Sequence, residues 1–168
     1  MSDHSVYVVR LDPPAGEVDA LAASVRAWMV EEGVVTEDGS PGDRWRSVLN
    51  DVETDPSVSA FAAVSVETEW QVFTAMGNLT PPTCARCGAQ RPEDIDYVEE
   101  WWVTRVEPEI TCPSCGWTAL DGDWPGPFWL AASDLAVRFW DWPLLSEQFL
   151  AAVRARLGGR TRVIYEHI

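Results

Sequence analysis

Four cysteines in two C-x-x-C pairs are the residues of this sequence whose types and spacing could do chemistry. Cys84 and Cys87 form the first pair, and Cys112 and Cys115 form the second. Zinc takes four thiolates at the corners of a tetrahedron, and two tight turns that face each other can supply them. Because all four ligands are cysteine, no coordination position is left for water. We therefore expect one structural zinc ion per chain and no hydrolytic metal centre.

A glycine follows each pair, so that the two segments read CARCG and CPSCG. Gly88 and Gly116 can take a positive φ, which turns backbone amides toward the sulfur atoms. This pattern resembles the paired knuckles of zinc ribbons and, locally, those of rubredoxins. The resemblance covers residues 81–120 and implies a short ribbon sheet held by the metal.

Two other uses of paired cysteines fit the sequence less well. A disulfide framework needs an oxidising compartment, and residues 1–6 have neither the basic segment nor the apolar run of a secretory signal. A redox dithiol normally opens a helix after a strand, whereas Pro81 and Pro82 precede the first pair. Two matched pairs also exceed what a dithiol requires. The thiolate site and the missing signal together predict a cytoplasmic protein.

The composition favours a folded, soluble protein. Apolar residues make up 46% of the 168 positions and include ten tryptophans, enough to build a core. No apolar stretch approaches the ~20 residues needed to cross a bilayer, so we expect no membrane association. All 12 basic residues are arginine, and with abundant Ala, Val, Gly and Asp this indicates a GC-rich bacterial genome.

The charge is strongly acidic and unevenly distributed. The chain carries 27 acidic and 12 basic residues, a net charge of −15. Residues 1–80 hold 14 acidic residues and 4 arginines, a net charge of −10. An acidic surface repels phosphate backbones, which argues against a nucleic-acid ligand. It suits either simple solubility or a basic protein partner.

Hydrophobic periodicity predicts one helix and two extended segments in the first half of the chain. The β-branched run at residues 6–11 predicts a buried strand. Apolar residues three or four apart over residues 18–29 predict a helix that ends at Gly33. Residues 58–76 follow a period of two and read as extended. The sequence leaves open whether residues 67–69 bend this segment into a hairpin.

The second half is predicted to be mainly strands, with one helix. The expected strands are residues 97–106, 109–111, 117–120, 135–140 and 162–168. The first three of these would form the ribbon sheet. Pro143 is expected in the first turn of the helix, and Gly158 is expected to end it.

This order predicts an α+β fold with ferredoxin-like βαβ…βαβ topology. Two helices would cover one face of an antiparallel sheet, and a four-cysteine zinc ribbon would be inserted between the two halves. Residues 1–80 and 121–168 would form the α+β domain, and residues 81–120 the inserted ribbon.

Tryptophans gather around the predicted ribbon, beside acidic residues. The candidate partner-binding residues are Trp101, Trp102, Trp124, Trp129, Glu99 and Asp123. On a strand, Trp101 and Trp102 point to opposite faces, so at least one would lie outside the ribbon core. Trp124 is in a Gly- and Pro-rich loop, which is the part least expected in a core. The alternative is that these rings seal the ribbon against the main sheet.

Signals for catalysis are few. The two histidines, His4 and His167, are near the ends of the sequence, and no nucleophile elbow, P-loop or dinucleotide motif is present. Glu67 and Glu69 would share one strand face and could act as a carboxylate pair.

The leading hypothesis is a non-catalytic, zinc-stabilised, acidic protein that binds a basic protein. One concrete form is an immunity or antitoxin-type inhibitor of a toxin with a basic cleft. The first alternative is an enzyme or biosynthetic accessory protein that uses the sheet carboxylates. The second is a zinc-ribbon regulator of nucleic acid.

Overall fold

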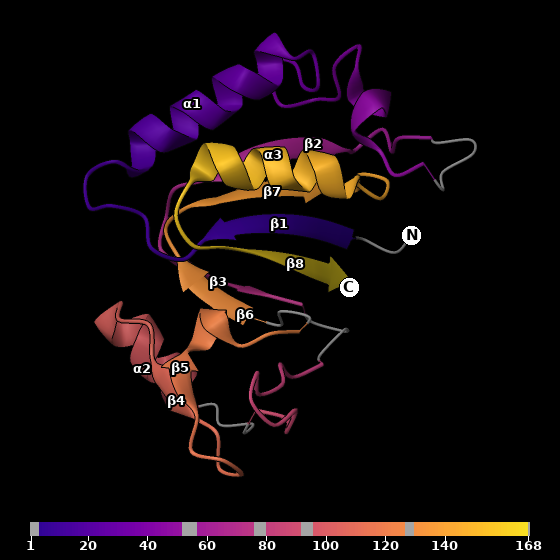
Figure 1. Cartoon of the computed structure of the whole chain (residues 1–168). Helices are drawn as coiled ribbons and strands as arrows, with labels where there is room; N and C mark the ends of the chain where they lie inside the picture. Colours follow the sequence, from indigo (N-terminus) through magenta and orange to yellow (C-terminus); the bar gives the residue numbers. More distant parts are fainter. Residues whose placement is uncertain (1–3, 52–56, 76–79, 92–95, 127–129, 168) are drawn as a thin grey trace.

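A four-stranded antiparallel sheet lies between a layer of helices and a second layer that carries the cysteines (Figure 1). The computed structural model describes residues 4–51, 57–75, 80–91, 96–126 and 130–167. Within them the helices and strands are β1 (His4–Arg10), α1 (Val18–Glu31), β2 (Ala63–Glu67), β3 (Gln71–Thr74), α2 (Asp96–Thr104), β4 (Glu109–Thr111), β5 (Thr118–Leu120), β6 (Leu130–Ser133), β7 (Ala136–Trp140), α3 (Glu147–Leu157) and β8 (Thr161–His167). Short 3-10 turns cover Trp45–Val48 and Asp121–Asp123.

The four-stranded sheet has the order β2-β7-β1-β8, and all its neighbours are antiparallel. Helix α1 lies in the chain between β1 and β2, and α3 lies between β7 and β8; both helices cover the same face of the sheet (Figure 1). The mixed α/β class with antiparallel sheets agrees with the sequence prediction. The sheets are split, however, because β3 pairs with β6 and β4 with β5 as separate two-stranded units.

Strand β1 is buried on both faces, as the apolar run in the sequence predicts. Val6 and Val8 belong to the core between the sheet and helices α1 and α3. Tyr7 and Val9 alternate with them and belong to a second core on the opposite face. There Tyr7 contacts Phe73 of β3, with ring centroids 5.2 Å apart. The central sheet is therefore shared by two cores, and it fixes the second layer to the first.

The helix ends are set by local residues. Gly33 follows α1 with a φ of 68°, which confirms the predicted stop. The prediction that Pro143 opens the next helix is wrong, because α3 begins at Glu147. The Ser146 side chain accepts a hydrogen bond from the Phe149 amide at 3.2 Å, so this residue caps the helix. Among the described residues, no helix is long and apolar enough to cross a bilayer.

The extended segment over residues 58–76 contains two strands that do not form a hairpin with each other. Strand β2 joins the main sheet beside β7, whereas β3 crosses to the second layer and pairs with β6. The chain therefore leaves the main sheet at β3 and returns to it after β6. The cysteine pairs and α2 lie within this excursion (Figure 1).

The strand predicted over residues 97–106 is wrong, because residues 96–104 form helix α2. Aromatic and β-branched residues favour strands only where they pack on a pleated surface. Here Trp101 is 1% exposed and packs beneath the main sheet, with Val98 three residues earlier on the same side. Tertiary packing has overridden the local preference.

Candidate metal centre

The two C-x-x-C turns have matching backbone structure. In the first, the Gly88 amide donates to the Cys84 carbonyl at 2.9 Å, and the Arg86 amide points at Cys84 Sγ from 3.4 Å. In the second, the Gly116 amide donates to the Cys112 carbonyl, also at 2.9 Å. The two glycines have φ values of 73° and 72°, and a Cβ at either would meet no atom within 4 Å. The glycines are therefore needed for their left-handed backbone conformation and not for space.

The four sulfur atoms lie close enough together to surround one ion. All four Sγ atoms are within 4.8 Å of one another. Two of the sulfur–sulfur contacts join the first turn to the second. Cys84 Sγ lies 3.6 Å from Cys115 Sγ, and Cys87 Sγ lies 3.7 Å from Cys112 Sγ. A disulfide would need about 2.05 Å, and all four cysteines are free. Metal–sulfur bonds of about 2.3 Å in a tetrahedron put neighbouring sulfurs about 3.8 Å apart, so the arrangement fits a four-thiolate metal site.

The group of four cysteine sulfurs is buried on one side and exposed to solvent on the other. Cys84 and Cys112 are buried, whereas Cys87 is exposed. The buried sulfurs share a small core with Trp124, whose ring centroid lies 5.0 Å from that of Trp117 in an edge-on arrangement. These two rings exclude water from one side of the cluster, where metal–sulfur bonds are best protected.

Backbone amides and neighbouring sulfurs shift the thiol pKa values in opposite directions. Burial raises the pKa of Cys112, but hydrogen bonds from the Ser114 and Cys115 amides and from nearby thiols outweigh it and bring this pKa to about 7. The Ala89 amide lowers the pKa of Cys87, yet desolvation and the neighbouring thiols raise it to about 12. The sulfurs thus differ in how readily they lose a proton, and a bound cation would favour the thiolate form of all four.

A fully buried ion pair links the segments that follow the two cysteine turns. Arg91 follows the first turn and Asp121 follows the second, and the exposed fraction of both side chains is 0%. One Arg91 Nη donates to Asp121, and the other donates to the Tyr97 hydroxyl. Desolvation lowers the pKa of Arg91. This pair could not be predicted from the sequence, because its members are 30 positions apart and no local pattern links them.

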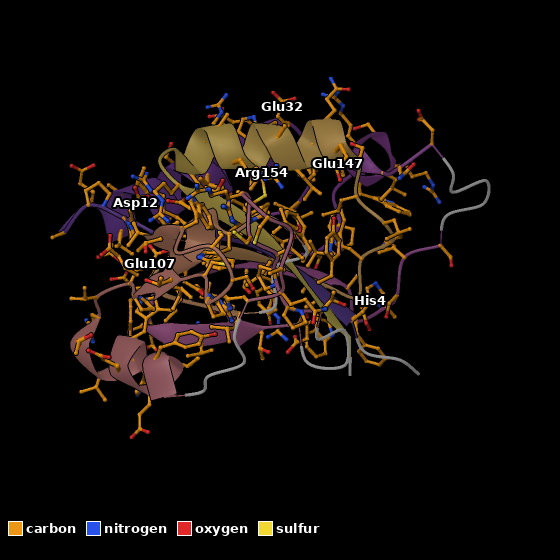
Figure 2. All side chains as sticks on the ribbon, turned by 60° about the horizontal axis from the view of Figure 1, so that its bottom comes forward. His4, Asp12, Glu32, Glu107, Glu147 and Arg154 are labelled. Atoms are coloured by element: carbon orange, nitrogen blue, oxygen red, sulfur yellow. The ribbon has the colours of Figure 1, made fainter. Side chains whose placement is uncertain are left out.

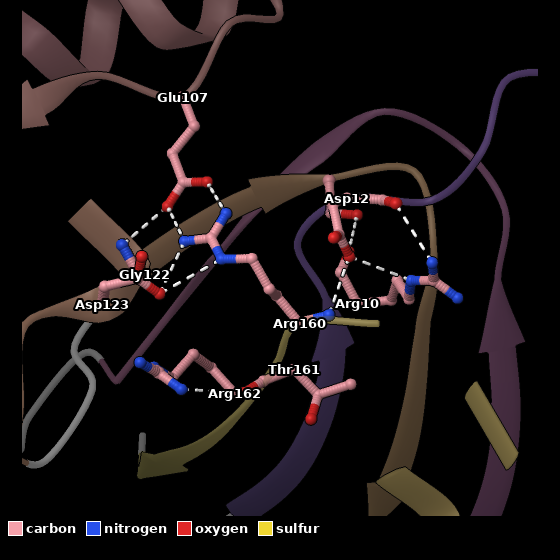
Figure 3. A network of polar contacts seen from close by, with 9 residues as sticks. Arg10, Asp12, Glu107, Gly122, Asp123, Arg160, Thr161 and Arg162 are labelled. Atoms are coloured by element: carbon pink, nitrogen blue, oxygen red, sulfur yellow. Dashed lines mark hydrogen bonds and ion pairs between the residues drawn. The ribbon is translucent and has the colours of Figure 1, made fainter. Parts of the chain in front are cut away.

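A second arginine, Arg160, links the layer that carries the cysteines to the main sheet (Figure 3). Arg160, just before β8, makes a bidentate contact with Glu107 at 2.5 and 2.9 Å and also binds Asp123 at 3.0 Å. Glu107 in turn accepts from the Gly122 amide at 2.7 Å. The Arg160 amide donates to Asp12 after β1 at 2.8 Å. The layer that carries the cysteines is therefore docked by charge-assisted hydrogen bonds, and not only through its chain connections.

The structure separates the residues that the sequence grouped as partner-binding. Trp101 and Trp124 are buried, and the expectation that Trp124 lies in an exposed loop is wrong, because its exposed fraction is 0%. Trp102 and Glu99 are exposed on α2. Asp123 is exposed but already binds Arg160. Trp129 lies outside the described residues.

The residues considered for catalysis lie on or beside the strands of the main sheet, where His4 of β1 is the register partner of His167 of β8. His4 Nε2 donates to the Trp142 carbonyl at 2.5 Å, a contact that fixes the start of β1. Glu67 accepts from the Ser65 hydroxyl at 2.6 Å, and Glu69 is exposed in the turn before β3. Glu67 is thus held by a neighbouring side chain, whereas Glu69 faces solvent.

Comparisons of the chain with protein-family models, curated protein sequences and solved structures find no match. The likeness to zinc ribbons therefore depends on the four-cysteine cluster itself, and the function must be argued from the arrangement of the residues.

Proposed function

We propose that this chain is a non-catalytic protein-binding protein whose binding surface is supported by one zinc ion. The observation that carries the proposal is an exposed apolar patch on α2 and just after it. Trp102 is 44% exposed, Val103 72% and Val106 67%. Exposed apolar residues that cluster at one place are typical of interaction sites, whereas isolated ones are common on any surface.

The patch, defined as Trp70, Trp102, Val103 and Val106, is structurally ordered. Trp70 Nε1 donates to the Trp102 carbonyl at 3.1 Å, and the two ring centroids are 6.3 Å apart. The Arg105 guanidinium lies 5.3 Å from the Trp70 ring centroid. A pre-formed aromatic surface loses little conformational entropy when a partner binds, which suits a binding hot spot.

The charge around the patch favours a basic partner. Glu99 and Glu100 are exposed on the same helix, and the whole chain has a net charge of −15. Opposite charge accelerates encounter, and the tryptophans would then slow dissociation. An inhibitor of the immunity or antitoxin type, whose target has a basic cleft, meets both conditions.

The proposed metal is zinc because four cysteine sulfurs within 4.8 Å of one another form the donor set that structural zinc prefers. Such sites carry a structural role and leave no position for substrate. The matching turns at Gly88 and Gly116 support a zinc-ribbon assignment for this part of the chain. We also propose a ferredoxin-like relationship for the main sheet, supported by its order β2-β7-β1-β8 with both helices on one face.

Protein purified without added metal is expected to contain about one zinc per chain, since four thiolates make one closed site. Cys112→Ser should lose the metal and increase hydrogen exchange in residues 81–91 and 96–120. Ser114→Ala, at an exposed neighbour, is the matched control and should retain both metal and protection. Elemental analysis with hydrogen-exchange mass spectrometry measures both. Iron instead of zinc would indicate a rubredoxin-like centre, and no metal in the wild-type protein would contradict the site.

Trp102→Ala is expected to weaken the partner complex by about 1–3 kcal/mol, as for a hot-spot tryptophan, with little change in melting temperature. Phe61→Ala is the control, because Phe61 is 69% exposed and precedes β2 in the other layer. The partner would be captured from a bacterial lysate with each variant, and its dissociation constant then measured at several salt concentrations.

The outcome depends on which variant releases the captured protein. A basic protein lost with Trp102→Ala and kept with Phe61→Ala supports the proposal. Equal retention by both variants would contradict it. Nuclease-sensitive capture of DNA or RNA would favour the regulator alternative instead.

A further inference from the structure

A cavity of about 600 Å³ lies beside β8, and neither a cysteine nor a residue of the α2 patch lines it. Glu147 and Arg154, which both come from α3 (Figure 2), line one part of it, and Arg162 and Tyr165 of β8 line another. Trp124 of the cysteine-bearing layer completes it. Cavities that hold small ligands usually measure about 300–1,000 Å³, so this one has a suitable size.

Two side chains that line this cavity each carry a hydrogen-bond donor with no acceptor in the described part of the chain. Arg154 Nε and Trp124 Nε1 are both buried and have no partner among the described residues. A buried donor left without an acceptor costs about 1–3 kcal/mol. Trp124 is fully buried, so bulk water does not offset that cost for its indole N–H. An acceptor that enters the cavity and reaches the Arg154 guanidinium would recover part of this free energy.

The charge of the cavity identifies the kind of acceptor. Arg154 and Arg162 provide two positive charges, and Glu147 provides one negative charge. The net charge of these three side chains favours a ligand with a single negative charge and disfavours a multiply charged anion. Guanidinium groups recognise oxyanions through directed N–H donors. The remaining wall includes the apolar residues Ala75, Val163 and Trp124.

We propose that this cavity binds a small organic acid, with its carboxylate near Arg154 and Arg162 and its apolar body beside Trp124. Arg154 provides the main charge contact, and the Trp124 ring forms part of the wall. This site is independent of the proposed protein partner, which would bind on α2.

The test is a titration of the metal-loaded, full-length protein with benzoate, followed by calorimetry and by the ¹⁵N indole signals. Benzoate should bind saturably with a dissociation constant of about 1 mM or tighter and shift the Trp124 indole signal. The signal is assigned with Trp124→Phe. Benzyl alcohol, which lacks the charge, and inorganic phosphate, which lacks the apolar body, should each bind at least about tenfold more weakly.

Arg154→Gln should weaken benzoate binding at least about tenfold, because a charge-assisted contact is lost. Arg156→Gln is the matched control on the same helix, where its guanidinium lies 5.2 Å from the Trp28 ring centroid. Arg154→Lys keeps the charge, and its intermediate affinity would separate charge from guanidinium geometry if Arg154→Gln unfolds. No saturable binding, an equal loss with Arg156→Gln, or equal affinity for benzyl alcohol would each overturn the proposal.

Discussion

Replacing Trp124 with alanine is expected to lower the free energy of unfolding by about 3–5 kcal/mol, the usual cost of removing a buried aromatic ring. Trp124 is fully buried, contacts the edge of Trp117 and shares its core with Cys84 and Cys112. Its loss leaves a void against the metal-binding turns, so metal affinity should fall as well. Urea denaturation of the metal-loaded protein measures the first effect, and competition with a chelator measures the second.

Trp102→Ala is the control for this experiment, because it removes the same side chain from a half-exposed position. Its cost should be within about 1 kcal/mol, as for most surface substitutions. If the two variants lose similar stability, Trp124 does not support the metal-binding layer.

Replacing Asp121 should lower the free energy of unfolding by a similar amount. Asp121→Ala leaves the buried Arg91 guanidinium without its ion-pair partner, and breaking a buried pair from one side costs about 3–5 kcal/mol. The double replacement Arg91→Met with Asp121→Leu should recover much of that loss, because it removes both charges together. Equilibrium denaturation of the wild-type protein and the two variants measures the pattern.

Glu32→Ala provides a contrast at an exposed ion pair. Glu32 and Arg44 lie 3.6 Å apart with half or more of each side chain exposed, so this change should cost less than about 1 kcal/mol. A double replacement at 91 and 121 that is no more stable than Asp121→Ala would show that the shape of the buried site matters more than its charge.

The part of the candidate site that could be predicted from sequence is the part encoded locally. Two C-x-x-C-G segments specify their own turns, since the cysteine spacing and the left-handed glycine act within five residues. Strand β1 and helix α1 could also be predicted from the sequence. The strand is apolar on both faces, and the helix is apolar on one face. Fold class followed from the order of these elements.

The remainder depends on contacts between distant residues. The sequence of α2 has strand-forming residues, and only the buried place of Trp101 beneath the main sheet makes it helical. Trp124 lies in a Gly- and Pro-rich loop, and its burial comes from packing on the second cysteine turn. The Arg91–Asp121 pair joins segments that no periodicity relates. Local pattern carries no information about such pairings.

The position of β1 in the sheet has a consequence during synthesis of the chain. Both neighbours of β1 come from the far end of the sequence, since Val9 pairs with Ala136 and with Arg162. At about 5–20 residues per second, the ribosome needs on the order of ten seconds to deliver β7 after β1. Until then, a strand that is apolar on both faces has no partner and is prone to aggregation. The nascent chain should therefore depend on a holding chaperone, and its sheet can close only after translation of β7.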